Sequence, residues 1–237
     1  MKRNQSGFTL IEIAIVLVII GLLLGGVLKG QELINSAKVK NLATDFKNIP
    51  VYIYGYQDKF RALPGDDGQV ATHLGATATP CTGVAGQCNV GNGMIDGNWN
   101  DTTAASETYV FWQHVRLAGL APGSTDTSPA AMASYLPTNA SGGTIGIQSG
   151  TSTPAASPIN GTAGANPIRG SYIICSSGIL GKFVKQLDIQ MDDGNPATGS
   201  MMAGLPVAAG GGPMTAATLT GATAVDDATT YTVCMGI

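Results

Sequence analysis

The chain opens with MKRNQSGFTLIEIAIVLVIIGLLLGGVLKG at residues 1–30, a stretch in which one side chain is out of place. Residues 8–28 are hydrophobic apart from Thr9 and Glu12, and no other charged residue occurs between Arg3 and Lys29. A helix of this length rises about 1.5 Å per residue and so reaches roughly 30 Å, the thickness of a bilayer's hydrocarbon core. We therefore expect residues 8–28 to span a membrane.

The residues that flank this segment predict its orientation. A secretory signal peptide has a shorter apolar region and a small-residue cleavage site, whereas Lys29, Gln31 and Glu32 follow this one without such a pattern. Lys2 and Arg3 precede it, and basic residues favour the cytoplasmic side. We expect the segment to stay on the protein, with the N-terminus inside and the remainder outside.

Glu12 needs a physical explanation, because a carboxylate near the bilayer centre costs about 2.5–3.5 kcal/mol. No other side chain of the span is cationic. One interpretation is that Glu12 lies near the interface and is partly hydrated or protonated. The other is that a cation from outside the chain neutralises it.

A basic leader followed by Gly7, Phe8, Thr9 and the run Leu10-Ile11-Glu12 closely resembles the N-terminus of type IV pilins and of the pseudopilins of type II secretion. The resemblance implies that prepilin peptidase cleaves between Gly7 and Phe8 and that Phe8 is then N-methylated. It also implies that Glu12 pairs with the N-terminal amine of a neighbouring subunit during assembly.

The same resemblance implies a structural subunit that is held in the bacterial inner membrane with a periplasmic head and is then assembled into a pilus or pseudopilus filament. The implied partners are further copies of the chain, other pilin-like subunits, the peptidase and an inner-membrane assembly platform. Lys29 departs from the family, since many members have a helix-bending proline there, whereas Gly21 matches a glycine that members often share. Looser similarity to pseudopilins occurs at residues 60–67, 111–120 and 186–199.

Beyond the span, apolar residues recur at spacings of three and four, which places them on one face of a helix. They are Val39, Leu42, Phe46, Ile49, Ile53, Tyr56 and Phe60. Pro50 interrupts the helix and is expected to kink it rather than end it. A free coiled coil is the alternative, but two heptads are short for one and charge pairing at e and g is not evident, so we favour packing on a head.

The predicted fold is α+β: a long N-terminal helix whose second half packs on a small antiparallel-sheet head with long loops. We divide the chain into a cleaved leader at 1–7, a membrane and filament-core helix at 8–28, an amphipathic helix at 29–60 and a periplasmic head at 61–237.

Short patterns predict the elements of the head. Ser106 and Glu107 can begin a helix that Gly119 closes, and Leu180, Val184, Leu187 and Met191 predict another. Strands are expected at 171–175, 200–205 and 230–235. The tracts at 121–167 and 206–228 are rich in Gly, Ala, Ser, Thr and Pro and are predicted to be long surface loops.

All four cysteines lie beyond the span, which suits an oxidising periplasm. Three pairings are open to them. We favour Cys81 with Cys88 and Cys175 with Cys234, which loop entropy would make worth about 2.5 and 4 kcal/mol. Buried free thiols are the alternative.

A calcium loop is one interpretation of residues 89–101, NVGNGMIDGNWND, because Asn92 and Asp96 match two of its positions. The positions where carboxylates are expected are Cys88, Val90 and Trp99, so a plain Asn/Gly turn is the alternative. Asp192 and Asp193 form a second acidic turn with the same two interpretations. Calcium is the single cofactor considered.

The sequence does not favour an enzyme. His73 and His114 are far apart, and no nucleophile-elbow, HExxH or P-loop pattern occurs. Asp66 and Asp67 could form an acid/base pair, but turn geometry explains them more simply. Nucleic-acid binding is disfavoured, because loss of the leader's Lys2 and Arg3 leaves 10 basic against 15 acidic side chains.

Two other functions remain open beside the filament subunit. The long loops could form an adhesive or substrate-binding tip, with the chain a minor pilin. A membrane-anchored hydrolase is the more distant alternative.

Overall fold

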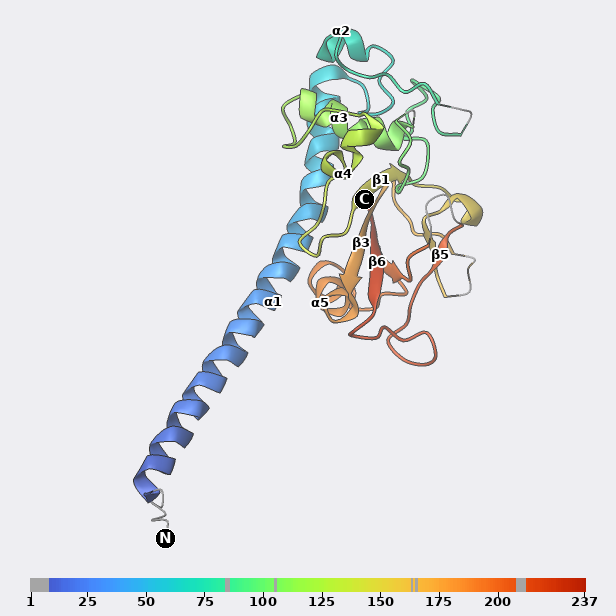
Figure 1. The fold of residues 1–237 in the computed structure, drawn as a ribbon. Helices are drawn as coiled ribbons and strands as arrows, with labels where there is room; N and C mark the ends of the chain where they lie inside the picture. The colour runs from blue at the N-terminus through green and yellow to red at the C-terminus, as the bar shows by residue number, and fades with distance from the viewer. Residues whose placement is uncertain (1–8, 84–85, 105, 163, 165, 208–211) are drawn as a thin grey trace. The chain divides into compact units, whose positions relative to one another are not determined.

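The computed structural model describes residues 9–83, 86–104, 106–162, 164, 166–207 and 212–237 (Figure 1). The chain divides into two compact units, Met1–Lys38 and Val39–Ile237. Its helices and strands follow in the order α1 (Leu10–Phe60), α2 (Val70–Leu74), α3 (Glu107–Leu117), η1 (Pro129–Ala131), α4 (Met132–Tyr135), β1 (Ile145–Ser149), η2 (Pro154–Ala156), β2 (Ile159–Asn160), β3 (Tyr172–Leu180), α5 (Gly181–Met191), β4 (Met201–Gly204), β5 (Met214–Thr215) and β6 (Thr230–Gly236).

Helix α1 runs through Pro50 without ending. Six of the seven residues of the predicted apolar stripe are buried, and Phe60, the last residue of the helix, is partly exposed. The stripe belongs to one hydrophobic core with α3, α5 and one face of the main sheet. The predicted packing of this part of the helix on the head is confirmed.

The main sheet has four antiparallel strands in the order β1-β3-β6-β4. Residues Ile174 and Val233, which alternate with their neighbours along the strands, face the core that contains α1. Ile173 and Met202 belong to a second core on the opposite face, together with β2 and β5. The α+β prediction is confirmed, and β2 and β5 add a small parallel sheet that was not expected.

The prediction that 121–167 and 206–228 are surface loops is wrong in part. Strand β1 is buried along its whole length, and it pairs with β3 from Ile145 opposite Ser176 to Ser149 opposite Tyr172. Met214 and Ala216 are buried in the second core. Both faces of β3 are apolar, and the helices cover only one of them. Side chains from these two tracts cover the other face. The composition of the tracts, which is rich in small residues, does not indicate this packing.

Both predicted disulfides are present, Cys81 with Cys88 and Cys175 with Cys234. The second joins directly opposed residues of β3 and β6 and lies fully buried in the second core. The predicted helices and strands also agree with α3, α5, β3, β4 and β6 to within a few residues, except that β3 continues to Leu180. Ser106 caps α3, and Gly119 follows the helix with a φ of 77°.

Candidate functional site

The first part of α1 exposes every side chain from Leu10 to Lys29, although these are the most apolar residues of the chain. Leu10 is 91% exposed and Leu22 is 73% exposed. Among the described residues, α1 is the one helix long and apolar enough to cross a membrane. Soluble proteins rarely leave such an apolar surface uncovered, so this segment requires a non-aqueous environment or a partner.

Thr9 and Glu12 form a reciprocal cap at the start of α1. The Thr9 backbone N–H and hydroxyl both donate to Glu12 Oε2, at 2.9 and 2.6 Å, and the Glu12 N–H donates to Thr9 Oγ1 at 3.3 Å. This is the capping box that the pattern T-x-x-E encodes. Sequence reasoning sought a partner for Glu12 outside the chain and missed this one, although Thr9-Leu10-Ile11-Glu12 spells the motif.

Glu12 Oε1 accepts no hydrogen bond from the residues that the structure describes. Both bonds from Thr9 go to Oε2, which leaves Oε1 for a second donor. Gly7 and Phe8, the predicted cleavage site, lie outside the described residues. The pairing of Glu12 with a neighbouring amine stays a prediction.

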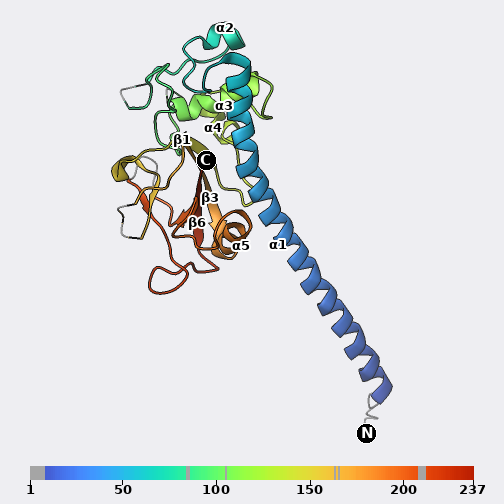
Figure 2. The same cartoon turned by 180° about the vertical axis from the view of Figure 1, so that it is seen from behind.

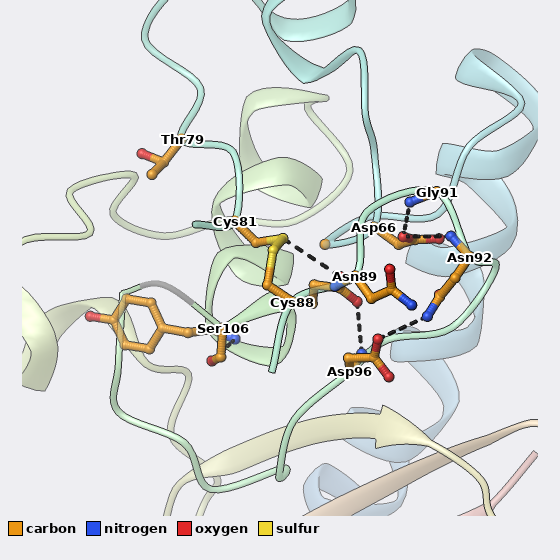
Figure 3. The surroundings of a disulfide bond; sticks show 12 residues. Asp66, Thr79, Cys81, Cys88, Asn89, Gly91, Asn92, Asp96 and Ser106 are labelled. Carbon is orange, nitrogen blue, oxygen red and sulfur yellow. Dashed lines mark hydrogen bonds between the residues drawn. A yellow bond between two sulfur atoms is a disulfide. The ribbon is translucent and has the colours of Figure 1, made fainter. Parts of the chain in front are cut away.

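In the head, two carboxylates hold the loop that follows Cys88. Asp66 lies against this loop, beside Gly91 and Asn92 (Figure 3), and Glu107 accepts hydrogen bonds from it. The Asp66 carboxylate accepts hydrogen bonds from the backbone amides of Gly91, Asn92 and Gly93, the last at 2.7 Å. Asp66 therefore anchors a loop 25 residues further along, and of the two aspartates it is Asp67 that bonds the local backbone, accepting the Gln69 N–H at 2.8 Å.

Glu107 is fully buried at the start of α3 and accepts the backbone N–H groups of Asn89 and Asp96, each at 2.7 Å. Its Oε1 also lies 3.5 Å from Cys81 Sγ of the disulfide. Burial raises the pKa of Glu107 to about 7, and the charges of Asp66 and Asp96 add to the effect. Because the carboxylate is fully occupied by the loop, we assign it a structural role.

Asn92 and Asp96 find their partners within this same loop. The Asn92 side-chain amide donates to Asp96 Oδ2 at 2.8 Å, and Asn92 Oδ1 accepts the Met94 N–H at 2.7 Å. This is the geometry of an Asx turn. It gives the two residues no support as calcium ligands, and calcium binding here stays untested.

Asp192 and Asp193 belong to a different cluster, at the C-terminal end of α5, where Asp188 joins them. Asp96 does not belong to this group of carboxylates. Asp188 is one of the buried residues of α5, and the apolar residues that predict this helix did not indicate its burial.

Asp67 and His73 form a hydrogen-bonded pair beyond the end of α1. Asp67 is buried and accepts from Tyr56 Oη and the Gln69 N–H, and its Oδ2 lies 2.7 Å from His73 Nδ1. His114 lies nearby: its ring stacks on that of Tyr56, with 6.4 Å between the ring centroids, and its Nδ1 accepts the Gly65 N–H at 2.9 Å. The pair therefore ties the end of α1 to α2.

Residues 2–28 match the model of the prokaryotic N-terminal methylation motif. This chain carries the pilin methylation signature. The motif is the signature of type IV pilins and pseudopilins, and the match contains the predicted cleavage site, Glu12 and most of the exposed apolar segment. No curated protein matches the chain. The motif and the long apolar helix fit a membrane-anchored, pilin-like structural subunit.

Proposed function

We propose that the chain is a structural subunit of a type IV pilus-like or type II secretion pseudopilus filament. In this proposal it is inserted in the bacterial inner membrane with its head in the periplasm. Prepilin peptidase then cleaves it between Gly7 and Phe8 and methylates Phe8. The mature chain assembles with copies of itself and with other pilin-like subunits on an inner-membrane platform.

The observation that carries the proposal is the unbroken exposure of α1 from Leu10 to Lys29 directly behind the methylation motif. Covering one large apolar side chain stabilises a protein by about 1.5–3 kcal/mol relative to leaving it in water. A bilayer covers this segment before assembly, and the equivalent helices of neighbouring subunits would cover it afterwards. Transfer between the two costs little, because both environments are apolar.

The glycines of this segment support close packing between subunits. A Cβ atom added at Gly21, Gly25 or Gly26 meets nothing within 4 Å in the single chain, so none of them is needed for the fold of one subunit. Small residues let neighbouring helices approach closely within an apolar environment. Their placement is therefore explained by contacts that form in a filament.

An adhesive or substrate-binding tip is the alternative that we disfavour. A tip of this kind needs long loops that are exposed and able to bind a ligand. Parts of the tracts at 121–167 and 206–228 are instead buried against the sheet. Shearing, purification and subunit counting test the choice. A principal structural subunit should dominate the filament mass, whereas a chain found only in trace amounts would reverse our preference.

Processing is tested separately in cells that contain a prepilin peptidase. Sequencing of the mature protein should begin at N-methylated Phe8, and Gly7→Val should keep the leader because a branched side chain obstructs the scissile bond. A mature N-terminus at any other residue would contradict the proposal.

A further inference from the structure

His114 is fully buried in α3, and both nitrogens of its ring are bonded to the main chain. Nδ1 accepts the N–H of Gly65, in the turn that follows α1, at 2.9 Å. Nε2 lies 2.9 Å from the carbonyl oxygen of Thr79, which precedes the Cys81–Cys88 disulfide. One imidazole therefore holds both ends of the segment 65–79, which contains α2, on α3.

These two hydrogen bonds require one tautomer of the neutral ring. Because Nδ1 accepts a backbone N–H, it carries no proton, so the single ring proton lies on Nε2 and is donated to Thr79. A second proton could bind only at Nδ1, where it would meet the Gly65 N–H, a donor facing a donor. The charged form of the ring is therefore incompatible with the contact to Gly65.

The surroundings hold both partners of the ring in place. Gly65 has a φ of 97°, and a Cβ there would meet the carbonyl oxygen of Glu107 at 2.7 Å, so a side chain at this position would displace the turn from α3. The Thr79 N–H donates to Gln113 Oε1 at 2.7 Å, beside the bond of its carbonyl group to His114. The Gly65 N–H cannot withdraw from a protonated ring unless the turn moves as well.

The charges around His114 do not compensate a protonated ring. Strand β1, which packs against α3, has no titratable group, and α3 itself carries Glu107, Tyr109 and Arg116. The other segments around α3 bring Tyr56 and Lys59 of α1, Asp66 and Asp67 of the turn after it, His73 of α2, Asp126, and Tyr135 of α4. Burial lowers the pKa of His114 below its usual 6.5, and the bond to Thr79 and the charge of Asp67 offset this only in part.

The segment 65–79 can open without the rest of the head. Its buried apolar side chains are those of Val70 and Ala78, and neither residue belongs to either of the two hydrophobic cores. The Cys81–Cys88 disulfide lies beyond the end of the segment and stays closed when the segment moves. A region with few core contacts opens at a lower free energy than the core itself.

We propose that His114 is an acid-sensitive switch, which holds the segment 65–79 on α3 while the ring is neutral and releases it when a proton from solvent binds Nδ1. The lowered pKa gives the sign: the contact is fully present above about pH 6.5 and is lost as the pH falls below that value. Glu107 responds in the opposite sense, because its pKa is raised, so the test must be local to the segment. The inference does not depend on the proposed function.

The first experiment observes the ring itself in the full-length protein in detergent. The chain has 2 histidines, so heavy-nitrogen labelling of histidine gives a simple NMR spectrum, which His73→Gln assigns. At neutral pH the His114 ring should show a protonated Nε2 and an unprotonated Nδ1, and it should titrate below about pH 6.5. The opposite tautomer, or titration at or above that pH, would overturn the proposal.

The second experiment measures opening by hydrogen exchange and mass spectrometry, corrected for the intrinsic effect of pH on exchange. From about pH 7 to about pH 5, protection of peptides within 65–79 should fall about 10–25-fold, while protection of β3 stays the same. Equal protection of the segment at both pH values, or an equal fall in β3, would contradict the proposal. This comparison needs no variant.

His114→Gln then tests whether the ring causes the fall. Glutamine can donate and accept hydrogen bonds but does not titrate, so protection of the segment in this variant should not depend on pH. His73→Gln is the matched control, since it removes the other histidine and should retain the full fall. A fall of wild-type size in His114→Gln, or its loss in His73→Gln, would show that another group is the switch.

Discussion

Leu22 and Leu42 lie in the same helix, yet Leu22 is 73% exposed and Leu42 is fully buried. The part of α1 around Leu22 is apolar on every face, and its side chains are exposed. The part from Val39 onwards has one apolar stripe, which the head covers. Leucine is equally hydrophobic in both parts of α1. The part whose apolar residues recur on one face packs within the chain, and the part that is apolar on all faces does not.

We therefore expect the two parts of α1 to contribute to different free energies. The buried part of α1 contributes to the free energy of unfolding of the head, and its loss should be visible in a single molecule. Under the proposed function, the exposed part contributes to membrane insertion and assembly, and its loss should be visible only when a bilayer or other subunits are present.

A matched pair of leucine substitutions gives the largest expected effect. Leu42→Ala should destabilise the head by about 2–5 kcal/mol, because it leaves a cavity in the core. Leu22→Ala should change head stability by less than about 0.5 kcal/mol. Urea unfolding of both variants in detergent measures the two values, and equal losses would mean that the parts of α1 are not energetically separate.

Substitution of Asp67 should have the next largest effect on the free energy of unfolding. Its hydrogen bonds to Tyr56 and His73 hold the end of the buried part of α1 in place. Asp67→Asn should cost about 1–3 kcal/mol at pH 7, because it replaces a buried acceptor of charge-assisted hydrogen bonds. Exposed Asp58→Asn is the control and should be nearly neutral. Denaturant unfolding at pH 7 measures both.

The pH dependence of Asp67 has a defined sign. Burial raises its pKa, but hydrogen bonds from His73, Tyr56 and Gln69 outweigh burial and hold the pKa below its usual value of 3.8. The stabilisation is thus present above about pH 4 and is lost as the pH falls through the lowered pKa. The difference between wild type and Asp67→Asn should shrink in acid, and a difference that grows there would contradict the assignment.

Substitutions at Glu12 give the smallest expected effect, and they act on the exposed part alone. Glu12→Gln can retain the cap with Thr9 but loses the charge, whereas Glu12→Ala loses both. If a neighbouring amine is the functional partner, both variants should yield about tenfold fewer sheared filaments while inserting and being cleaved normally. Wild-type yield from Glu12→Gln would show that the cap with Thr9 is what matters.

The sequence predicted the elements whose signals are local. The stripe from Val39 to Tyr56, the Ser106 cap and the strand expected at 230–235 each follow from a few neighbouring residues. Strand β1 was missed, because Ile145-Gly-Ile-Gln-Ser is short and lies in a tract of small polar residues, and only pairing with β3 buries it. The interactions of Asp66, Glu107 and Asp188 were missed for the same reason, since their partners or their burial depend on contacts that no local pattern reveals.

The position of β6 in the main sheet has a consequence for the order of folding. Strand β6 lies beside β3 (Figure 2), and its other edge pairs with β4. In the described part of the chain, β4 pairs with no other strand of the main sheet. During synthesis, β1 and β3 can pair as they emerge, but β4 has no partner strand in the main sheet until β6 follows. Non-local pairing of this kind is slow and leaves strands vulnerable to aggregation. Closure of the Cys175–Cys234 disulfide, which spans 59 residues, would then report completion of the sheet.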